Sequence, residues 1–456
     1  MATNNYIVAI EVGSSKISGA VGLQTYSGIK ILAYANESVN NFVSKGVVRN
    51  VDETGNSINS LINRLESSLD NVSIDKAYVA FGGLSMHTRK SSAVREFSEY
   101  TKITHDIIDQ MSIENENLFN IPDGYQRVQV IPLECRLNGD SSISPIGIPT
   151  RRIECNYQNI LLREQYMKQL QESFAMANIK IVDSFNAIIL DAGVLLSDEE
   201  RSGGAVLVNI GADTTTVAIY TNKLLRRLVV IPLGSSNVTR DLCAEQIPYK
   251  EADQMKIFKG YHSTDDDNSA IPTELVDQII SARMSEILLN VKHQIEESGY
   301  KVGNIVFTGG GSKLKNIENI IEECLPNFKI KMASEESYSY ICDDKLSLAT
   351  GAITPTLYAL LCKGKENCCA EAIKPSPEQY QSDLFGNVIN PEPTNNEETK
   401  EENQTKVTEE KEEGHETKER KQSKKTKKEK PRLFGWITEF IDNATNDEED
   451  NITDKE

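Results

Sequence analysis

The sequence predicts an α/β protein with two similar halves around a cleft, each with a mixed sheet flanked by helices. Up to about residue 370, short apolar runs alternate with turn residues and segments of helical periodicity. One strand–turn–strand pattern also occurs twice: a strand over 6–12 ends in Gly13-Ser14-Ser15-Lys16, and a strand over 205–210 ends in Gly211-Ala212-Asp213-Thr214-Thr215. The two leading glycines are 198 positions apart (211 − 13), which indicates duplicated half-domains rather than a solenoid.

The charge and the cysteine pattern exclude several kinds of function. The 456 residues carry a formal net charge of −19, so we expect no nucleic-acid partner. The eight cysteines form no CxxC pair, and the adjacent Cys368 and Cys369 have no histidine near them; this predicts reduced thiols rather than disulfides or a zinc site. The N-terminal residues lack signal-peptide features, and no apolar run reaches the roughly 20 residues of a membrane span. We therefore expect any membrane contact to be peripheral.

Three glycine-containing turns are candidates for nucleotide binding. In the two repeated turns, glycine lets the backbone approach a phosphate, while N–H groups and Ser/Thr hydroxyls can donate to its oxygens. The third turn, Gly309-Gly310-Gly311-Ser312, follows an apolar strand over 304–308 and precedes a helical pattern, which leaves space for a flat ring near a helix N-terminus. Each turn taken singly is more typical of a plain turn, and neither a P-loop nor a GxGxxG pattern occurs.

The order of these turns resembles the actin, Hsp70 and sugar-kinase superfamily. In that superfamily one phosphate hairpin opens each half, and a glycine-rich adenosine turn follows late in the second half. The segment Ala252-Asp253-Gln254-Met255-Lys256 is similar to its AExxK helix, whose acid and lysine flank the ribose and adenine. The resemblance implies ATP bound by the three turns together with Asp253 and Lys256. A solvated i,i+3 ion pair is the alternative interpretation of Asp253 and Lys256.

Three positions that carry acids in this superfamily pattern are changed here. The resemblance puts aspartate where this chain has Glu11 before the first turn, Asn209 before the second and Thr216 after it. Those acids orient magnesium, through water, and the attacking water. Glu11 retains a carboxylate for a water-mediated Mg²⁺, whereas Asn209 cannot supply the charge that polarises a water. We therefore expect nucleotide binding with slow or absent hydrolysis, which leaves an enzymatic role uncertain.

The long segment between Gly82-Gly83 and about Leu162 resembles the FtsA family of division proteins. Its IPD, VQVIPL and PIGI stretches, at 121–123, 128–133 and 145–148, are similar to the subdomain that separates that family from actin. Further similar stretches bring the resemblance to about residues 6–362. It implies an actin-like two-domain ATPase fold with an FtsA-type, SHS2-like insertion. The implied subdomains are 1–83 with 162–202 (1A), 84–161 (1C), 203–237 with 301–369 (2A) and 238–300 (2B).

The C-terminal part of the sequence predicts a tethered membrane anchor. Residues 370–430 are rich in Pro, Glu, Asn, Thr and Lys and predict a disordered linker. Residues 431–445 predict an amphipathic helix that follows a basic stretch, and residues 446–456 form an acidic tail. This helix contains the chain's single Trp, a residue that favours the headgroup boundary. Docking of the helix onto protein is the alternative. The side chains expected to contact anionic lipid are Leu433, Phe434, Trp436, Ile437, Phe440 and Ile441.

The FtsA resemblance implies a role in bacterial cell division. The chain would bind ATP, self-assemble, and anchor filaments of the tubulin-like protein FtsZ to the cytoplasmic face of the inner membrane at the septum. It would contact the FtsZ C-terminal tail through 238–300 and recruit later division proteins. Two alternatives remain: a kinase or ATPase chaperone of the same superfamily, and a pilus-assembly protein with the same type of insertion. A catalytic acid would favour the first, and a dispensable C-terminal helix the second.

Overall fold

The computed structural model describes residues 5–26, 28–69, 71–258, 272–343, 346–349 and 351–371. These residues belong to one compact unit, Met1–Ile373. The predicted anchor helix, the acidic tail and nearly all of the predicted linker lie outside the described residues. None of the described helices is both long enough and apolar enough to cross a membrane.

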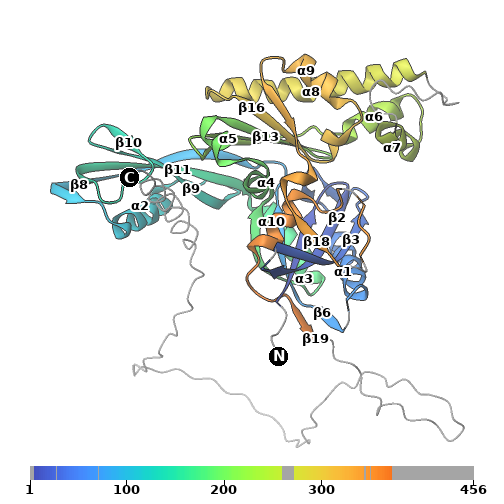
Figure 1. Ribbon diagram of the computed structural model, residues 1–456, viewed down its shortest axis with the longest axis horizontal. Coiled ribbons are helices and arrows are strands. Elements are labelled where there is room, and N and C mark those ends of the chain that lie inside the picture. The colour runs from blue at the N-terminus through green and yellow to red at the C-terminus, as the bar shows by residue number, and fades with distance from the viewer. Residues whose placement is uncertain are drawn as a thin grey trace, which may run out of the picture. The chain divides into compact units, whose positions relative to one another are not determined.

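The first half is built on a six-stranded sheet (Figure 1). Three antiparallel neighbours, β1, β2 and β3, form its N-terminal part, and β7 and β12 extend it parallel to β1. At the opposite edge β18 pairs parallel with β3. The order is β12-β7-β1-β2-β3-β18, with bounds Lys180–Asn186, Lys76–Phe81, Tyr6–Val12, Lys16–Thr25, Gly28–Ser38 and Tyr340–Cys342.

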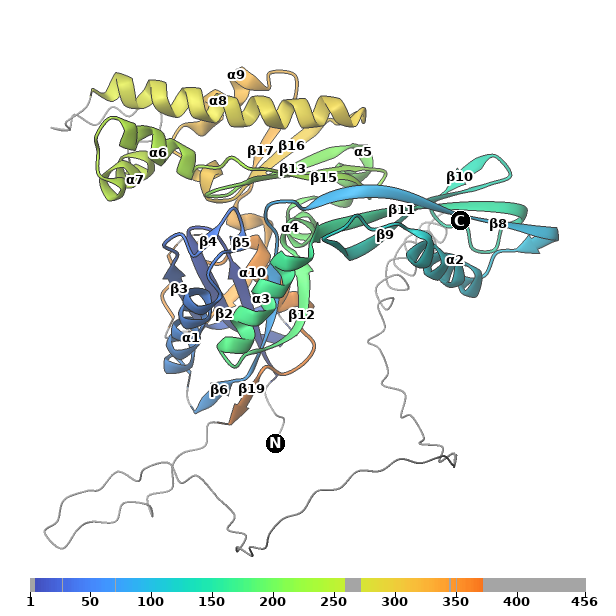
Figure 2. The ribbon, with the colours of Figure 1, turned by 180° about the vertical axis from the view of Figure 1, so that it is seen from behind.

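Helices cover both faces of this sheet. Helices α1 (Val51–Ser67) and α3 (Glu164–Met176) lie on the face turned to the viewer in Figure 2, and α10 (Pro355–Lys363) lies on the other face beside α4 (Ala187–Leu195). Helix α1 begins at the N-cap Asn50, whose side chain accepts a hydrogen bond from the Glu53 amide. Its buried Leu61 and Leu65 pack so closely on β2 that a Cβ at Gly19 would lie 3.0 Å from a Leu65 methyl carbon.

The second half repeats the strand order of the first. The order β15-β14-β13-β16-β17 corresponds to β3-β2-β1-β7-β12, with the same antiparallel and parallel pairings. The duplication predicted from the two turns is therefore confirmed in the sheet topology. These strands span Leu224–Ile231, Thr215–Thr221, Ala205–Ile210, Asn304–Thr308 and Lys329–Met332.

Strand β13 is buried on both faces, and its alternate residues serve two cores. Val206, Val208 and Ile210 pack with helix α8 (Thr273–Ser298), whereas Ala205 and Leu207 belong to the core of the first half. One apolar face of α8 is buried along the helix by Met284, Ile287, Leu288, Val291 and Ile295, and Leu275 and Ile279 nearer its start are partly buried. The other helices of this half are α6 (Ser236–Ala244), α7 (Tyr249–Phe258) and α9 (Ile317–Cys324).

The segment predicted as the insertion forms long strands that project to one side (Figure 2). Strand β8 meets β15 at the pair His87–Val229 and so continues the second sheet into nine strands. Helix α2 packs on these strands around its own small core, which includes Ile103, Met111 and Ile153. The elements are β8 (His87–Lys102), α2 (His105–Leu118), β9 (Tyr125–Leu137), β10 (Asp140–Ser142) and β11 (Pro149–Arg163).

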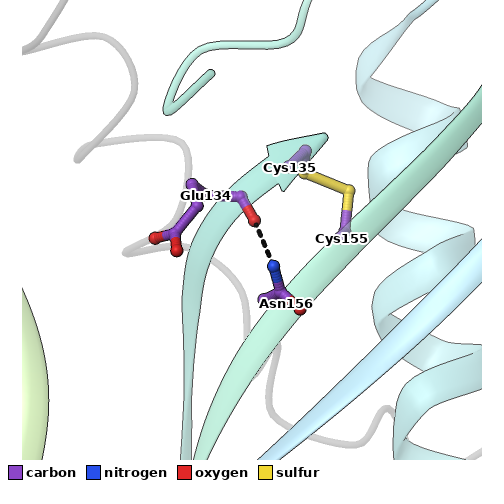
Figure 3. The surroundings of a disulfide bond; sticks show 4 residues. All are labelled: Glu134, Cys135, Cys155 and Asn156. Atoms are coloured by element: carbon purple, nitrogen blue, oxygen red, sulfur yellow. Dashed lines mark hydrogen bonds between the residues drawn. A yellow bond between two sulfur atoms is a disulfide. The ribbon is translucent and has the colours of Figure 1, made fainter. Parts of the chain in front are cut away.

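Two of the cysteines form a disulfide, so the prediction of reduced thiols is wrong for this pair. Cys135 on β9 and Cys155 on β11 are directly opposite each other in the antiparallel ladder, with their Cα atoms 4.0 Å apart (Figure 3). The adjacent Asn156 side chain donates a hydrogen bond to the Glu134 carbonyl on the partner strand. The two cysteines lie 20 positions apart in sequence, and strand register alone brings them together.

The end of the second-half range, predicted as 301–369, also needs correction. Strand β18, helix α10 and β19 (Cys369–Glu371) return to the first half: β18 joins its sheet, and β19 pairs with β6 (Val72–Ile74). Leu357, Leu360 and Leu361 of α10 lie in the first core. An apolar helix fits either sheet by its sequence alone, and only chain topology selects one. The remaining short elements are β4 (Val43–Ser44), β5 (Val47–Val48), α5 (Asp198–Gly203), η1 (Gly310–Lys313) and η2 (Glu335–Ser337).

Candidate functional site

The two repeated turns have the same backbone geometry. In the first, the Gly13 amide donates to the Lys16 carbonyl at 3.0 Å; in the second, the Gly211 amide donates to the Thr214 carbonyl at 2.8 Å. A Cβ on either glycine would lie 3.0 Å from that carbonyl oxygen, so both positions favour glycine. Each turn is also held by the segment that follows the third strand of its half, through the Val39 and Ser235 amides.

A separate short turn at residues 44–46, between β4 and β5, contacts both of the repeated turns. Its two central residues, Lys45 and Gly46, both have positive φ angles, 53° and 68°, as in a type I′ hairpin. The Gly46 amide donates to the Ser14 hydroxyl in the first turn at 2.8 Å. The Lys45 amide donates to the Asp213 carboxylate in the second turn at 3.1 Å. The 44–46 turn therefore connects the two halves where the sequence predicts phosphate binding.

The Asp213 carboxylate is the centre of this connection. One of its oxygens, Oδ2, accepts from the Lys45 amide and from the Ser44 hydroxyl at 3.3 Å. The other oxygen, Oδ1, accepts from Nη2 of Arg240 on α6 at 2.8 Å. The Asp213 side chain is 14 % exposed. A single side chain predicted to help bind phosphate thus already receives hydrogen bonds from both halves.

Behind the turns lie two buried or partly buried acids. Glu11, at the end of β1, accepts a hydrogen bond from the Thr354 hydroxyl at 2.8 Å. Asp191, on the apolar helix α4, accepts from the Thr356 hydroxyl at 2.6 Å and from the Asn209 side-chain amide at 3.0 Å. The N-cap and the first turn of α10 therefore supply one hydroxyl to each carboxyl group, Thr354 to Glu11 and Thr356 to Asp191.

Burial favours the neutral form of both acids. It raises the pKa of Glu11 above its ordinary value, while the Thr354 hydrogen bond and the Lys16 charge lower it by less. Burial also raises the pKa of Asp191 to about 7, the Thr356 and Asn209 hydrogen bonds oppose this, and the nearby Glu11 charge adds to it.

The third glycine turn packs against β13. A Cβ at Gly309 would lie 2.4 Å from Oδ1 of Asn209, and one at Gly311 would lie 2.4 Å from a methyl carbon of Ile210. The Ser312 hydroxyl donates to the Gly309 carbonyl at 2.8 Å. These glycines therefore allow close contact between η1 and β13, and their role toward an adenine ring stays a prediction.

The predicted acid and lysine of α7 form a closed local network. The Lys256 ammonium donates to Asp253 at 2.6 Å and to the Thr239 hydroxyl at 2.9 Å, and Thr239 donates to Asp253 at 3.0 Å. The Lys256 side chain is 12 % exposed. Thr239 is next to Arg240 on α6, so this network adjoins the Asp213 connection. Its contacts fit the ion-pair interpretation, except that the pair is partly buried.

The remaining predicted residues are distributed among these features. Ala212 and Thr214 complete the second turn, and Ser15 and Lys16 are exposed in the first. Thr215 is buried, and its hydroxyl donates to the Leu233 carbonyl at 2.9 Å. Gly310 has open space where a Cβ would lie. The structure thus brings Glu11, Asn209 and both repeated turns together.

Comparison with known proteins agrees with this architecture. The family described as cell division protein FtsA matches residues 206–351. An FtsA of Porphyromonas gingivalis (strain ATCC BAA-308 / W83) is 29% identical over 358 residues, which cover 72% of this chain and 73% of that protein. An FtsA of Bacillus subtilis (strain 168) is 24% identical over 372 residues, covering 77% and 84%. The chain is similar to these FtsA proteins over about three quarters of its length.

A solved structure supports the fold of this chain. The type IV pilus biogenesis complex PilM–PilN contains a chain that superposes with a TM-score of 0.57 at 14% identity. The match covers 78% of this chain and 96% of that one. At this identity the similarity shows the actin-like fold alone.

The described residues do not fit the magnesium-bound ATP that the FtsA resemblance implies. A carboxylate, that of Asp213, stands in the predicted second phosphate turn and accepts hydrogen bonds from an amide, a hydroxyl and a guanidinium, groups of the kind that bind phosphate. A pocket beside the 44–46 turn is lined by Val12, Gly46 and Phe81 and otherwise by first-half residues, so it does not reach the second turn.

Several residues of this site were missed by the sequence prediction. Asp191 carried a signal, because it is the one acid in the apolar stretch 187–196. Asp213 was predicted to bind the cofactor, so its position was found but its partners were missed. The signal against cofactor binding was its charge, because a carboxylate repels a phosphate. Arg240, Thr354 and Thr356 carried no signal that we can identify, since each acts through a partner far away in sequence.

Proposed function

We propose that this chain is a cell division protein that self-assembles and attaches filaments of the tubulin-like protein FtsZ to the cytoplasmic face of the inner membrane at the septum, where it recruits later division proteins. The observation that carries the proposal is the similarity to FtsA proteins along about three quarters of the chain. The projecting segment of β8, β9 and β11 supports it, since the stretches that resemble FtsA most specifically lie there.

The proposed membrane contact is the amphipathic helix predicted over 431–445. Six large apolar side chains on one face, each contributing about 1.5–3 kcal/mol if fully buried, give a gross stabilisation near 10 kcal/mol. Partial burial and the entropy of ordering the helix reduce this value. A polymer that presents many such helices binds far more firmly than one copy, so self-assembly is part of the proposed mechanism.

The proposed contact for the FtsZ C-terminal tail lies in 238–300. Within the described part of this range, α7 exposes three large apolar side chains, those of Tyr249, Ile257 and Phe258, at 56, 55 and 71 %. Such side chains would give a short peptide an apolar surface to contact.

Adenine nucleotide has a limited place in the proposal. We propose ATP as a weak ligand that competes with the Asp213 carboxylate for the same donors. We expect hydrolysis to be slow or absent, because Asn209 supplies no charge to polarise a water. The chain would then act by attachment rather than by catalysis.

Flotation with lipid vesicles tests attachment to the membrane and to the partner together. The purified full chain is mixed with phosphatidylglycerol-containing vesicles and a labelled peptide with the sequence of the FtsZ C-terminal tail. We expect the wild type to carry the peptide into the floating fraction. The variant W436E/F440E should lower flotation of both at least tenfold, because it places two charges on the apolar face.

The matched control is T438E, which adds a charge to the polar face of the same predicted helix and should float like the wild type. Flotation of W436E/F440E at the wild-type level would contradict the proposed anchor. Flotation of the wild type without the peptide would contradict the proposed partner, and would favour the pilus-assembly alternative if a pilus partner is carried instead.

A further inference from the structure

The donors around Asp213 are the set that proteins use to bind a phosphate. They comprise a backbone N–H from Lys45, a hydroxyl from Ser44 and a guanidinium from Arg240, at 3.1, 3.3 and 2.8 Å from the carboxylate oxygens. Backbone amides, hydroxyls and arginine all favour oxyanions, whether carboxylate or phosphate. With Asp213 in place, each of these three groups already donates a hydrogen bond to a carboxylate of the chain itself.

The donors come from both halves of the molecule. Lys45 and Ser44 belong to the first half, whereas Arg240 is on α6 of the second half. Asp213 itself also belongs to the second half and lies in the turn between β13 and β14. The 44–46 turn is held in place from behind, since Gly46 packs on Gly83 so closely that a Cβ at Gly46 would lie 2.7 Å from the Gly83 Cα. The carboxylate therefore links a fixed turn of one half to a helix of the other.

The equivalent position in the first turn shows what Asp213 adds. Counting from the leading glycines, Ser15 is equivalent to Asp213, and Ser14 to Ala212. Ser15 is exposed, and the first turn contacts the 44–46 turn through the neutral Ser14 hydroxyl. Of the two repeated turns, the second therefore carries the negative charge. This charge is on Asp213, which accepts hydrogen bonds from three groups.

We propose that the Asp213 carboxylate takes the place of a nucleotide phosphate and joins the two halves at their turns without nucleotide. A bound phosphate would have to displace Lys45, Ser44 and Arg240 from Asp213 while facing its negative charge. The buried acids Glu11 and Asp191 behind the turns add no compensating positive charge. The inference rests on the assignment of this region as the nucleotide site, and not on the proposed FtsZ or lipid contacts.

Nucleotide titration of the full chain tests the competition. Binding of a fluorescent ATP analogue with Mg²⁺ is compared for the wild type, D213G and D213N. We expect D213G and D213N to bind at least tenfold more tightly than the wild type. The control D198N removes the same charge from an exposed ion pair with Arg201 and should leave the affinity unchanged. Equal or weaker binding by both Asp213 variants would overturn the proposal.

Hydrogen exchange of the 44–48 segment tests the connection between the halves independently. In the wild type we expect the Lys45 amide to be equally protected with and without ATP. In D213G its protection should fall at least tenfold without nucleotide and recover when ATP is bound. D213N keeps an oxygen acceptor and should show intermediate protection, which preserves the test if D213G does not fold. Wild-type protection that depends on ATP would overturn the proposal, whatever the vesicle experiment gives.

Discussion

The two repeated turns share a backbone and differ in chemistry. Both close with a hydrogen bond from the leading glycine, and both are held by the segment after the third strand of their half. The first turn carries the exposed Ser15 and Lys16. The second carries the Asp213 carboxylate, bound by donors from both halves. Duplication has therefore preserved the shape of the turn, while a single side chain decides what the turn can bind.

The acids behind the turns differ in the same way. In the first half Glu11 is on the strand that leads into the turn, whereas in the second half the equivalent strand has Asn209, and the acid comes from Asp191 on α4. Asn209 donates to Asp191, so the pair forms one hydrogen-bonded unit. The second half thus has an amide, Asn209, where the first half has the Glu11 carboxyl group, and this amide donates to a buried acid on the first-half helix α4, whose pKa is raised to about 7.

The largest expected effect is that of D191N on stability at alkaline pH. Because the folded-state pKa of Asp191 is raised, its contribution to stability is greatest below pH 3.8 and is lost as pH rises through about 7. At roughly 1.4 kcal/mol per pKa unit, D191N should increase the free energy of unfolding by roughly 4 kcal/mol at pH 8 and roughly 2 kcal/mol at pH 5.5. Urea denaturation at the two pH values measures the difference. If the difference in the free energy of unfolding between D191N and the wild type is the same at both pH values, Asp191 does not titrate in this range.

The next effect tests the support of the second turn. A Cβ at Gly234 would lie 2.4 Å from the Ala212 carbonyl oxygen and 2.7 Å from the Thr214 amide nitrogen. We expect G234V to lower the free energy of unfolding by about 3 kcal/mol, because the backbone of the turn has to move. The control G203A has nothing within 4 Å of its new Cβ and should change stability by less than about 1 kcal/mol. Chemical denaturation distinguishes them, and equal stability of the two variants would contradict the packing argument.

The smallest effect comes from S15D, which gives the first turn the acid that the second turn has. Ser15 is exposed, and the donors Ser44, Lys45 and Arg240 bind the Asp213 carboxylate rather than the Ser15 side chain. We expect a change in the free energy of unfolding below about 0.5 kcal/mol, as for an ordinary surface substitution. Thermal denaturation provides the measurement. A stabilisation above about 1 kcal/mol would mean that the position in the turn matters, and not the partners of Asp213.

Local sequence patterns determined three of the strands and both repeated turns. The predicted strands over 6–12, 205–210 and 304–308 have those bounds in the structure. Each is an apolar run between turn residues, so local hydrophobicity and glycine placement suffice to find it. The duplication followed from the same local signals. It predicted two similar halves, and the structure shows the same strand order in both sheets.

The sequence by itself determined the predicted strands, the duplication and the actin-like fold class, because these depend on local patterns of neighbouring residues. Only the tertiary structure decided that 340–371 returns to the first sheet, that Cys135 meets Cys155, and that Asp213 receives Lys45 and Arg240. Each of these contacts joins residues from 20 to over 300 positions apart, and strand register and the packing of the two halves set them. The chemistry of the site follows from those long-range contacts, since the partners of a carboxylate decide whether it repels a phosphate or stands in its place.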